Sequence, residues 1–172
     1  KSDSAKNLTA RWVSGPLLAG ASWWDYAIEG SGGDVKEQAQ RAWAGFTFPF
    51  GLFVGLAYDQ SKLKTTAGDL KRTSWMVPVN YTLGNNKFYV TYATAGDLDG
   101  TSDTGANAYT VGWDYAFSKR TSAGVYYSKI DNDIAASYNM FAVSVAGTAT
   151  GGSAATLGQD PKIIYFGVAH NF

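Results

Sequence analysis

The residues of this chain that could do chemistry are few, and their spacing does not assemble a catalytic site. His170 is the only histidine, and it lies two residues from the last residue with no partner nearby in the sequence. A histidine-based triad is therefore not expected. Cysteine is absent, which excludes a disulfide framework and a thiolate metal site. We predict that the chain is not an enzyme and that it uses no cofactor.

Acidic residues gather at the edges of expected loops, as Asp97 with Asp99 and as Asp131 with Asp133. Solvated loop charge explains these pairs more simply than acid–base chemistry does. Asp97, Asp99 and Asp103 suggest a divalent cation site as an alternative, but the glycine and the bidentate glutamate of an EF-hand are missing. The stretch GSGG at 30–33 precedes no helix, so it does not predict a phosphate cradle. No metal site is predicted.

A second set of charged residues falls within segments where polar and apolar residues alternate. Burying such ions in a dry core costs several kcal/mol each without dedicated partners, whereas on a water-filled wall they stay hydrated. We therefore predict that this set lines a pore, with the three arginines forming a basic stripe on neighbouring strands that run in the same direction. The predicted pore-lining residues are Arg11, Arg41, Arg72, Lys87, Asp25, Asp59 and Asp114.

The composition departs from that of an ordinary soluble domain. Of 172 residues, 15% are aromatic and 16% are charged, against about 25% charged in typical soluble domains. The 14 basic residues equal the 14 acidic ones, so no charge excess points to nucleic acid. No apolar run approaches the roughly 18 to 20 residues of a membrane-spanning helix. A transmembrane β-barrel remains possible, since its segments are individually weaker.

Period-two alternation dominates the chain and predicts an all-β fold. In the clearest segment, Tyr109, Val111, Trp113, Tyr115 and Phe117 alternate with small or polar residues. About nine such segments occur, each close to the length of a tilted strand that crosses a bilayer. We expect a single domain with strands at 5–14, 17–29, 38–49, 51–61, 70–82, 87–97, 106–118, 121–131 and 162–172.

The predicted connections alternate between tight turns and long polar loops. The tight turns fall at 14–16, 48–51, 83–86 and 118–121, and the long links at 29–37, 60–69, 96–105 and 132–161. Short turns at one end and long loops at the other are typical of a transmembrane barrel. Two segments are harder to interpret: Pro78 interrupts a strand and suggests a bulge, and 138–145 has the pattern of a short extra strand.

Two interpretations compete for the apolar face of these strands. In a soluble lipocalin-like barrel it would point inward, and in a transmembrane barrel it would meet lipid. The charged residues on the opposite positions favour the membrane, as do aromatic residues near both strand ends, which resemble interfacial girdles. The predicted membrane-interface aromatics are Trp12, Trp24, Tyr26, Phe46, Phe48, Trp75, Phe88, Phe117 and Phe172, whereas Phe53 falls at a polar position.

Three stretches resemble a known family, the third more weakly than the others. The stretch DYAFSKRTSAGVYYSKIDN at 114–132 resembles the strand, turn and strand of Gram-negative trimeric porins of the Neisseria and Burkholderia type, with Phe117 in place of the usual leucine. The ending DPKIIYFGVAHNF at 160–172 is similar to the end of that family, although Ala169 stands where arginine is common. The stretch ARWVSGPLLAGASWW at 10–24 is similar to two strands, joined by a short Gly-Pro turn, from the middle of that family's sequences.

The resemblance implies an antiparallel barrel of sixteen strands, of which this chain would supply the last nine as the C-terminal half of a longer protein. A nine-stranded open sheet would leave two bare edges in lipid, which points the same way. The resemblance further implies a homotrimer in the outer membrane, in contact with lipid and lipopolysaccharide and with both chain ends facing the periplasm. Phe172 would be part of the signal read by the outer-membrane assembly machinery.

The expected function is therefore passive diffusion of small hydrophilic solutes and ions through a water-filled channel. A complete small barrel that acts as a structural anchor or adhesin through its long loops is an alternative, with 138–145 as an additional strand. A soluble lipocalin-like binding protein is a third.

Overall fold

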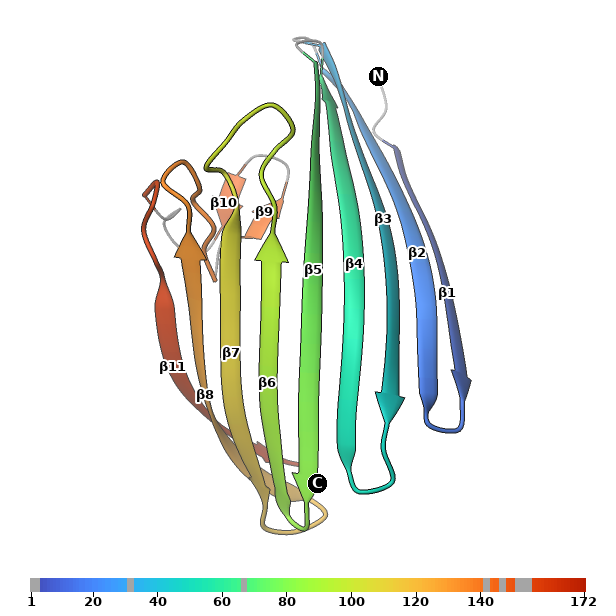
Figure 1. Ribbon diagram of the computed structural model, residues 1–172, viewed down its shortest axis with the longest axis vertical. Coiled ribbons are helices and arrows are strands. Elements are labelled where there is room, and N and C mark those ends of the chain that lie inside the picture. The colour runs from blue at the N-terminus through green and yellow to red at the C-terminus, as the bar shows by residue number, and fades with distance from the viewer. Residues whose placement is uncertain (1–3, 31–32, 66–67, 141–142, 146–147, 151–155) are drawn as a thin grey trace.

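The structure is a computed structural model, and it describes residues 4–30, 33–65, 68–140, 143–145, 148–150 and 156–172. Nine antiparallel strands form one curved sheet, in which β1 to β8 follow one another in chain order and β11 pairs with β8 (Figure 1). These strands are β1 (Ser4–Ser14), β2 (Leu17–Gly30), β3 (Gly33–Thr47), β4 (Leu52–Thr65), β5 (Gly68–Leu83), β6 (Asn86–Ala95), β7 (Ala106–Ala116), β8 (Thr121–Asn132) and β11 (Lys162–His170).

All nine predicted strands are confirmed, and the main difference is length. Two hairpins extend into segments that were expected to be loops, because β3 begins at Gly33 and β4 continues to Thr65. The β2–β3 ladder pairs residues as far as Gly30 with Gly33. Polar residues on both faces of a hairpin are compatible with pairing in water, since the ladder needs only backbone groups. Pairing therefore covers most of the two segments that were predicted as links.

The connections at one end of the sheet are short, and those at the other end are longer in the C-terminal part (Figure 1). Glycines with positive φ make three of the short turns, namely Gly15 at 54°, Gly51 at 90° and Gly84 at 57°. This left-handed backbone region favours glycine because a Cβ atom is crowded there. We call this end of the sheet the short-turn end and the opposite end the long-loop end.

Pro78 does not cause a bulge. The β4–β5 pairing keeps one register from Leu52–Tyr81 to Thr65–Gly68 but skips Gly55 and Leu56, the positions beside the proline. On the other side, Pro78 remains paired with Thr91 of β6. The proline therefore costs ladder hydrogen bonds on one side only, without shifting the side chains to the other face.

The connection from β8 to β11 carries a separate two-stranded ribbon of β9 (Val143–Val145) and β10 (Thr148–Thr150). The expected strand at 138–145 thus falls partly on β9, while positions 141 and 142 lie outside the described residues. The ribbon does not join the main sheet, whose edges are β1 and β11. Among the described strands the sheet is therefore open, and no observation favours the small closed barrel.

A dry core is missing from the described part of the chain. Its buried apolar residues are Ala106 and Ala136, and it has no large side chain that is fully buried. A soluble barrel would bury its bulky rings, so the lipocalin-like alternative does not fit. Within the same residues, no helix is long and apolar enough to cross a membrane.

Candidate pore wall

Cross-strand register divides the sheet into two faces, because directly paired residues point to the same side. In β7, Tyr109, Val111 and Trp113 lie on one face, which we call the apolar face. Thr110 and Asp114 lie on the other, which we call the polar face. The pairings extend both faces across all nine strands.

The apolar face is the more exposed of the two, although it carries the bulkier side chains. Tyr109, Val111 and Trp113 are 43%, 48% and 41% exposed. The smaller Thr110 and Asp114 on the polar face of the same strand are half-buried. Because a curved sheet shelters its concave side, the polar face is the concave one. Bulky apolar groups outside and polar groups inside are the arrangement of a transmembrane barrel.

Six of the seven predicted pore-lining residues share the concave polar face. One row of direct cross-strand partners on this face runs from Thr9 through Ser22 and Arg41 to Asp59. The other predicted residues are assigned to a face by the same pairing. The six are Arg11, Arg41, Asp59, Arg72, Lys87 and Asp114.

Asp25 requires a correction, because the structure puts it on the apolar face. Its cross-strand partners are Lys6 and Gln38, and Gln38 Nε2 donates to Asp25 Oδ2 at 2.8 Å. Lys36 Nζ also lies 2.9 Å from that oxygen. The error has a simple origin, since the adjacent Trp23 and Trp24 obscure which positions of β2 are the apolar ones.

Arg41 and Asp59 form an ion pair on the concave wall. They are direct cross-strand partners, and Arg41 Nε lies 3.1 Å from Asp59 Oδ2. The arginine side chain is 60% exposed and the aspartate 22%. An ion pair this accessible contributes only about 0.2 to 1 kcal/mol to stability. Its main effect is local neutralisation of two wall charges.

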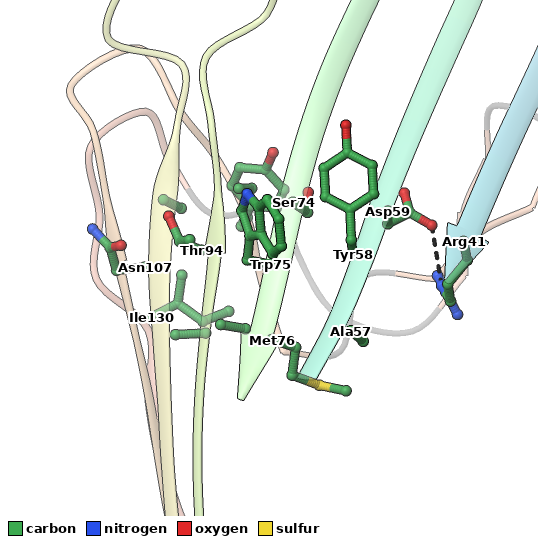
Figure 2. Close-up of a pocket in the computed structure, with 15 residues that line it drawn as sticks. Arg41, Ala57, Tyr58, Asp59, Ser74, Trp75, Met76, Thr94, Asn107 and Ile130 are labelled. Atoms are coloured by element: carbon green, nitrogen blue, oxygen red, sulfur yellow. Dashed lines mark hydrogen bonds and ion pairs between the residues drawn. The ribbon is translucent and has the colours of Figure 1, made fainter. Parts of the chain in front are cut away.

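A hollow of about 340 Å³ opens beside this ion pair (Figure 2). Ser74 and Met76 of β5 line it, together with small alanines of β4, β6 and β7. Tyr138, from the connection that follows β8, also lines the hollow, so that connection reaches the concave side. Figure 2 shows Arg41 and Asp59 at one side of the hollow and Ile130 at the other.

Arg72 has structural partners in two loops, which the sequence did not predict. Its Nη2 donates to the backbone oxygen of Thr104 at 2.9 Å. Its guanidinium carbon lies 5.1 Å from the centre of the Tyr138 ring, a cation–π distance. Burial raises the pKa of the Tyr138 hydroxyl above its usual value, although Arg72 opposes this effect. Arg72 therefore joins the 96–105 loop to the connection after β8.

Asp114 accepts hydrogen bonds from two tyrosines of neighbouring strands. Tyr89 Oη donates to Asp114 Oδ2 at 2.7 Å, and Tyr126 Oη donates to Oδ1. Lys87 is the direct cross-strand partner of Asp114, yet its Nζ lies 5.0 Å over the Tyr89 ring. The carboxylate is thus satisfied by hydroxyls, and the lysine is left exposed on the wall.

Glycines on the polar face make room for aromatic rings of the next strand. A Cβ atom at Gly45 would lie 2.5 Å from the Phe53 ring, and one at Gly112 would overlap the Tyr126 ring. These rings lie flat along the wall instead of projecting into the concave space. This packing explains why Phe53 occurs at a polar position of β4.

Most of the predicted interface aromatics lie on the apolar face or beside the short turns. Trp12, Phe88, Trp75 and Phe117 are 55%, 42%, 46% and 64% exposed. The ring centres of Trp75 and Tyr58 lie 4.6 Å apart towards the long-loop end. The remaining predicted aromatics lie towards the short-turn end. Phe46 packs edge-on against Phe48, with 4.8 Å between the ring centres, and Phe172 is the last residue.

Trp24 and Tyr26 are the exceptions and require a second correction. They stack on each other at 5.8 Å on the polar face, where Trp24 pairs with Asn7 and Ala39. Trp23 takes the outward position instead, opposite Leu8. The correction has the same cause as that for Asp25, namely the paired tryptophans of β2.

In the acidic loop at 96–105, the carboxylate of Asp97 forms hydrogen bonds within the loop itself. Asp97 Oδ1 accepts hydrogen bonds from the backbone nitrogens of Thr104 and Gly105, at 2.8 and 2.9 Å. Asp103 has a positive φ of 60° at the tip of the loop. Over the described ranges, no group of three or more acidic or histidine side chains could hold a metal ion.

Comparison with solved structures places this sheet among outer-membrane porins. An anion-selective porin from Comamonas acidovorans matches with a TM-score of 0.78 and 20% identity, over 95% of this chain and 48% of that chain. OmpT, an outer membrane protein of Vibrio cholerae, matches with a TM-score of 0.74 and 13% identity, over 98% of this chain and 56% of that one. The trimer form of OmpT matches with a TM-score of 0.72 over the same shares.

The chain therefore spans about half the length of these structures, and at such identities the likeness shows the fold. No curated protein sequence is significantly similar to the chain. The family model for Gram-negative porins matches residues 7–135, which is most of the chain. Taken with the nine-stranded antiparallel sheet and its outward apolar face, this match shows that the chain belongs to the Gram-negative porin family.

Proposed function

We propose that this chain forms part of the wall of a water-filled outer-membrane channel that admits small hydrophilic solutes and ions by passive diffusion. The observation that carries the proposal is the separation of the faces. Towards the short-turn end, charged side chains lie on the concave face, and exposed aromatic and aliphatic side chains cover the convex one. Lysines and aspartates occur on the convex face as well, but towards the long-loop end. In such a channel no bond is made or broken; wall charge and width alone select the solutes.

The arginines support a basic ladder along the wall rather than a ring around it. Arg11 lies three residues from the end of β1 at Ser14, and Arg41 lies six from Thr47. Arg72 lies eleven from the end of β5 at Leu83. At about 3.3 Å per residue, the three lie roughly 10, 20 and 36 Å along their strands from the short-turn end. An anion moving through the pore would meet them in succession.

The three arginines would not contribute equally to selectivity. Asp59 neutralises Arg41, and Arg72 is engaged by Thr104 and Tyr138. Arg11 is exposed and has no hydrogen bond or ion pair within the described part of the chain. We therefore expect Arg11 and Lys87 to dominate the field on this wall and to give a mild preference for anions.

The rest of the proposed assembly follows from the family and from the open edges of the sheet. The chain would be the C-terminal half of a sixteen-stranded barrel, with β1 and β11 pairing with the strands of the other half. The complete protein would be a homotrimer in lipid and lipopolysaccharide, with both chain ends in the periplasm. Phe172 would be read by the outer-membrane assembly machinery.

Conductance in a planar lipid bilayer tests the proposal. The complete protein should give ohmic current, with a reversal potential under a potassium chloride gradient that shows anion preference. Arg11→Gln should reduce this preference more than Arg72→Gln does. Absence of current from correctly folded protein would contradict a channel, and unchanged reversal potentials in all three arginine variants would contradict their role.

A further inference from the structure

The hollow of about 340 Å³ beside Arg41 and Asp59 lies on the concave face, yet its floor is apolar. Two neighbouring rows of direct cross-strand partners form this floor. One row runs from Asp59 through Ser74 to Ala95 and Ala106. The next row towards the short-turn end consists of Ala57, Met76, Ala93, Ala108 and Ile130. An exposed apolar patch with a polar rim is typical of a ligand-binding groove.

Small and bulky side chains together give the hollow its shape. The alanines keep the floor low, whereas Met76 and Ile130 rise from it (Figure 2). Met76 is 40% exposed although it lies on the concave face. A ligand that covers these apolar groups removes their surface from water, which favours binding. A methionine side chain also adapts readily to the shape of what it contacts.

Tyr138 bounds the hollow from the connection that follows β8, and the sheet holds it in position. Its backbone nitrogen donates to Asn132 Oδ1 at 2.9 Å, and Asn132 Nδ2 donates to its backbone oxygen at 3.0 Å. The guanidinium of Arg72 lies over its ring. This wall of the hollow is therefore formed without a ligand, which lowers the cost of ordering it on binding.

The ion pair at the edge of the hollow keeps part of its bonding capacity. Arg41 contacts Asp59 Oδ2 through its Nε atom. Within the described ranges, the two Nη groups of Arg41 and the Oδ1 atom of Asp59 make no other hydrogen bond. Paired guanidinium N–H groups suit a carboxylate, and a carboxylate oxygen accepts from an ammonium group. The edge thus presents a positive and a negative group side by side.

These two features together match a zwitterion with an apolar side chain. An α-amino acid carries its carboxylate and its ammonium group on one carbon atom, so both can meet a neighbouring pair of opposite charges. In a peptide at least one peptide unit separates the two charges, so this match is lost. A volume of about 340 Å³ lies near the lower end of the about 300 to 1,000 Å³ of ligand sites, which suits a small solute.

We propose that the concave wall binds α-amino acids with apolar side chains, with the carboxylate on Arg41, the ammonium group on Asp59 and the side chain on the alanine floor. The inference deepens the proposed function by naming a class of solute, and it rests on that function only for access through the lumen. Affinity should be low, because both charges remain accessible to water and a diffusing solute must leave again.

Protection of a single thiol tests the site without relying on conduction. Ala93→Cys places a thiol in the floor of the hollow, in a complete protein that has no other cysteine. A water-soluble methanethiosulfonate reagent is added in detergent, with or without solute. Leucine and phenylalanine should slow its reaction, whereas glycine, which has no side chain, should not. 4-Methylpentanoate and 3-methylbutylamine each lack one charge of leucine and should require about tenfold higher concentrations.

Matched variants separate the elements of the site. A thiol introduced by Lys87→Cys lies on the same strand and face, six residues or about 20 Å from Ala93, and should not be protected. In the Ala93→Cys protein, Arg41→Gln or Asp59→Asn should raise the leucine concentration needed for protection about tenfold. Arg120→Gln, in the turn between β7 and β8, removes one positive charge elsewhere and should leave protection unchanged. Heat-dependent gel mobility verifies the folding of each variant.

Three results would overturn the proposal. Equal protection by leucine and by glycine would remove the apolar contact. Unchanged protection in both the Arg41 and the Asp59 variants would remove the contact with the zwitterion. A thiol at position 93 that does not react even without solute would show that another segment of the complete protein fills the hollow.

The same measurements separate this site from the channel. Protection by leucine in a folded protein that carries no current would count against the channel alone. Ohmic current without protection by leucine would count against the site alone.

Discussion

Arg41 and Asp59 are direct cross-strand partners on the concave face, and their side chains meet at 3.1 Å between Nε and Oδ2. The pair places one positive and one negative charge at the same point of the wall. Each charge therefore masks the other, and removing one of them leaves the field of its partner unmasked: positive without Asp59, negative without Arg41. Variants of these two residues can therefore distinguish an electrostatic effect on ion flow from a general loss of structure.

Neutralising the two partners separately should shift ion selectivity in opposite directions. Asp59→Asn exposes the Arg41 charge and should raise the ratio of chloride to potassium permeability, whereas Arg41→Gln should lower it. A unit charge 4 Å from an ion in water contributes about 1 kcal/mol, so we expect changes of about two- to fivefold. Reversal potentials in a salt gradient measure both.

The double variant Arg41→Gln, Asp59→Asn is the control for this pair and should return close to the wild-type ratio. Shifts of the two single variants in the same direction would contradict local masking. Raising the salt concentration should reduce all the shifts, since mobile ions screen exposed charges.

A second prediction concerns the packing of Tyr126 and Asp114 over glycines. A Cβ atom at Gly124 would overlap Asp114 Oδ1 and lie 2.9 Å from the Tyr126 ring. Gly124→Ala should therefore lower the free energy of unfolding by about 1 to 3 kcal/mol, as overpacking does. Urea unfolding of the protein in lipid vesicles measures this change.

Gly167 supplies the matched control, because it is the direct cross-strand partner of Gly124 and a Cβ atom there would meet nothing within 4 Å. Gly167→Ala should leave the stability unchanged or raise it slightly, since alanine has less freedom in the unfolded chain. Equal destabilisation by both alanines would contradict the packing described here.

A third prediction assigns Arg72 a role in ordering the long loops. Arg72→Met removes the hydrogen bond to Thr104 and the cation–π contact with Tyr138. Amide hydrogen exchange in residues 96–105 and 133–140 should then become faster, because both segments lose a shared anchor. Strands β6 and β7 should keep their protection.

Changes at Tyr138 distinguish the ring from its hydroxyl. Among the residues that the structure describes, the buried hydroxyl of Tyr138 has no hydrogen bond of normal geometry, so Tyr138→Phe should have little effect on exchange. Tyr138→Ala removes the ring over Arg72 and should resemble Arg72→Met. A variant Arg72→Met with unchanged exchange in both loops would show that the loops are ordered without it.

A fourth prediction concerns Asp97, which holds the loop between β6 and β7 closed. Asp97→Ala leaves the backbone nitrogens of Thr104 and Gly105 without their acceptor. Unpaired buried donors cost about 1 to 3 kcal/mol, so the loop should open and become sensitive to protease. Asp99→Ala is the matched control and should remain resistant, and equal cleavage of both variants would contradict the assigned role.

The alternation of side chains was sufficient to predict all nine strands, because a sheet with one face in lipid and one in water needs two kinds of residue. Strand ends were less predictable. Pairing continues through polar segments such as 60–65 in β4, where backbone hydrogen bonds and not side-chain burial determine the length. The effect of Pro78 was also not predictable, because a bulge and a simple gap in the β4–β5 pairing fit the same sequence. The structure has the gap, with one register on both sides of it.

The residues of the concave wall were predictable in strands such as β3 and β7, where polar and apolar residues alternate regularly and every second residue points to the same face. This reasoning failed in β2, because the adjacent Trp23 and Trp24 leave the apolar positions ambiguous. Asp25 was predicted on the polar face and Tyr26 on the apolar face, and the structure has them the other way round. The partners of Arg72 could not be found from sequence, because Thr104 and Tyr138 are brought to it by loops without a repeating pattern.

The most direct measurement of the central claim is the environment of alternate residues along β7. The chain has no cysteine, so single cysteines can be placed at Thr110 and Val111 and labelled in protein inserted into vesicles. A fluorophore at Val111 should be quenched by nitroxide lipids, and the thiol at Thr110 should react with a water-soluble reagent. Quenching at Thr110 and aqueous reactivity at Val111 would contradict the account.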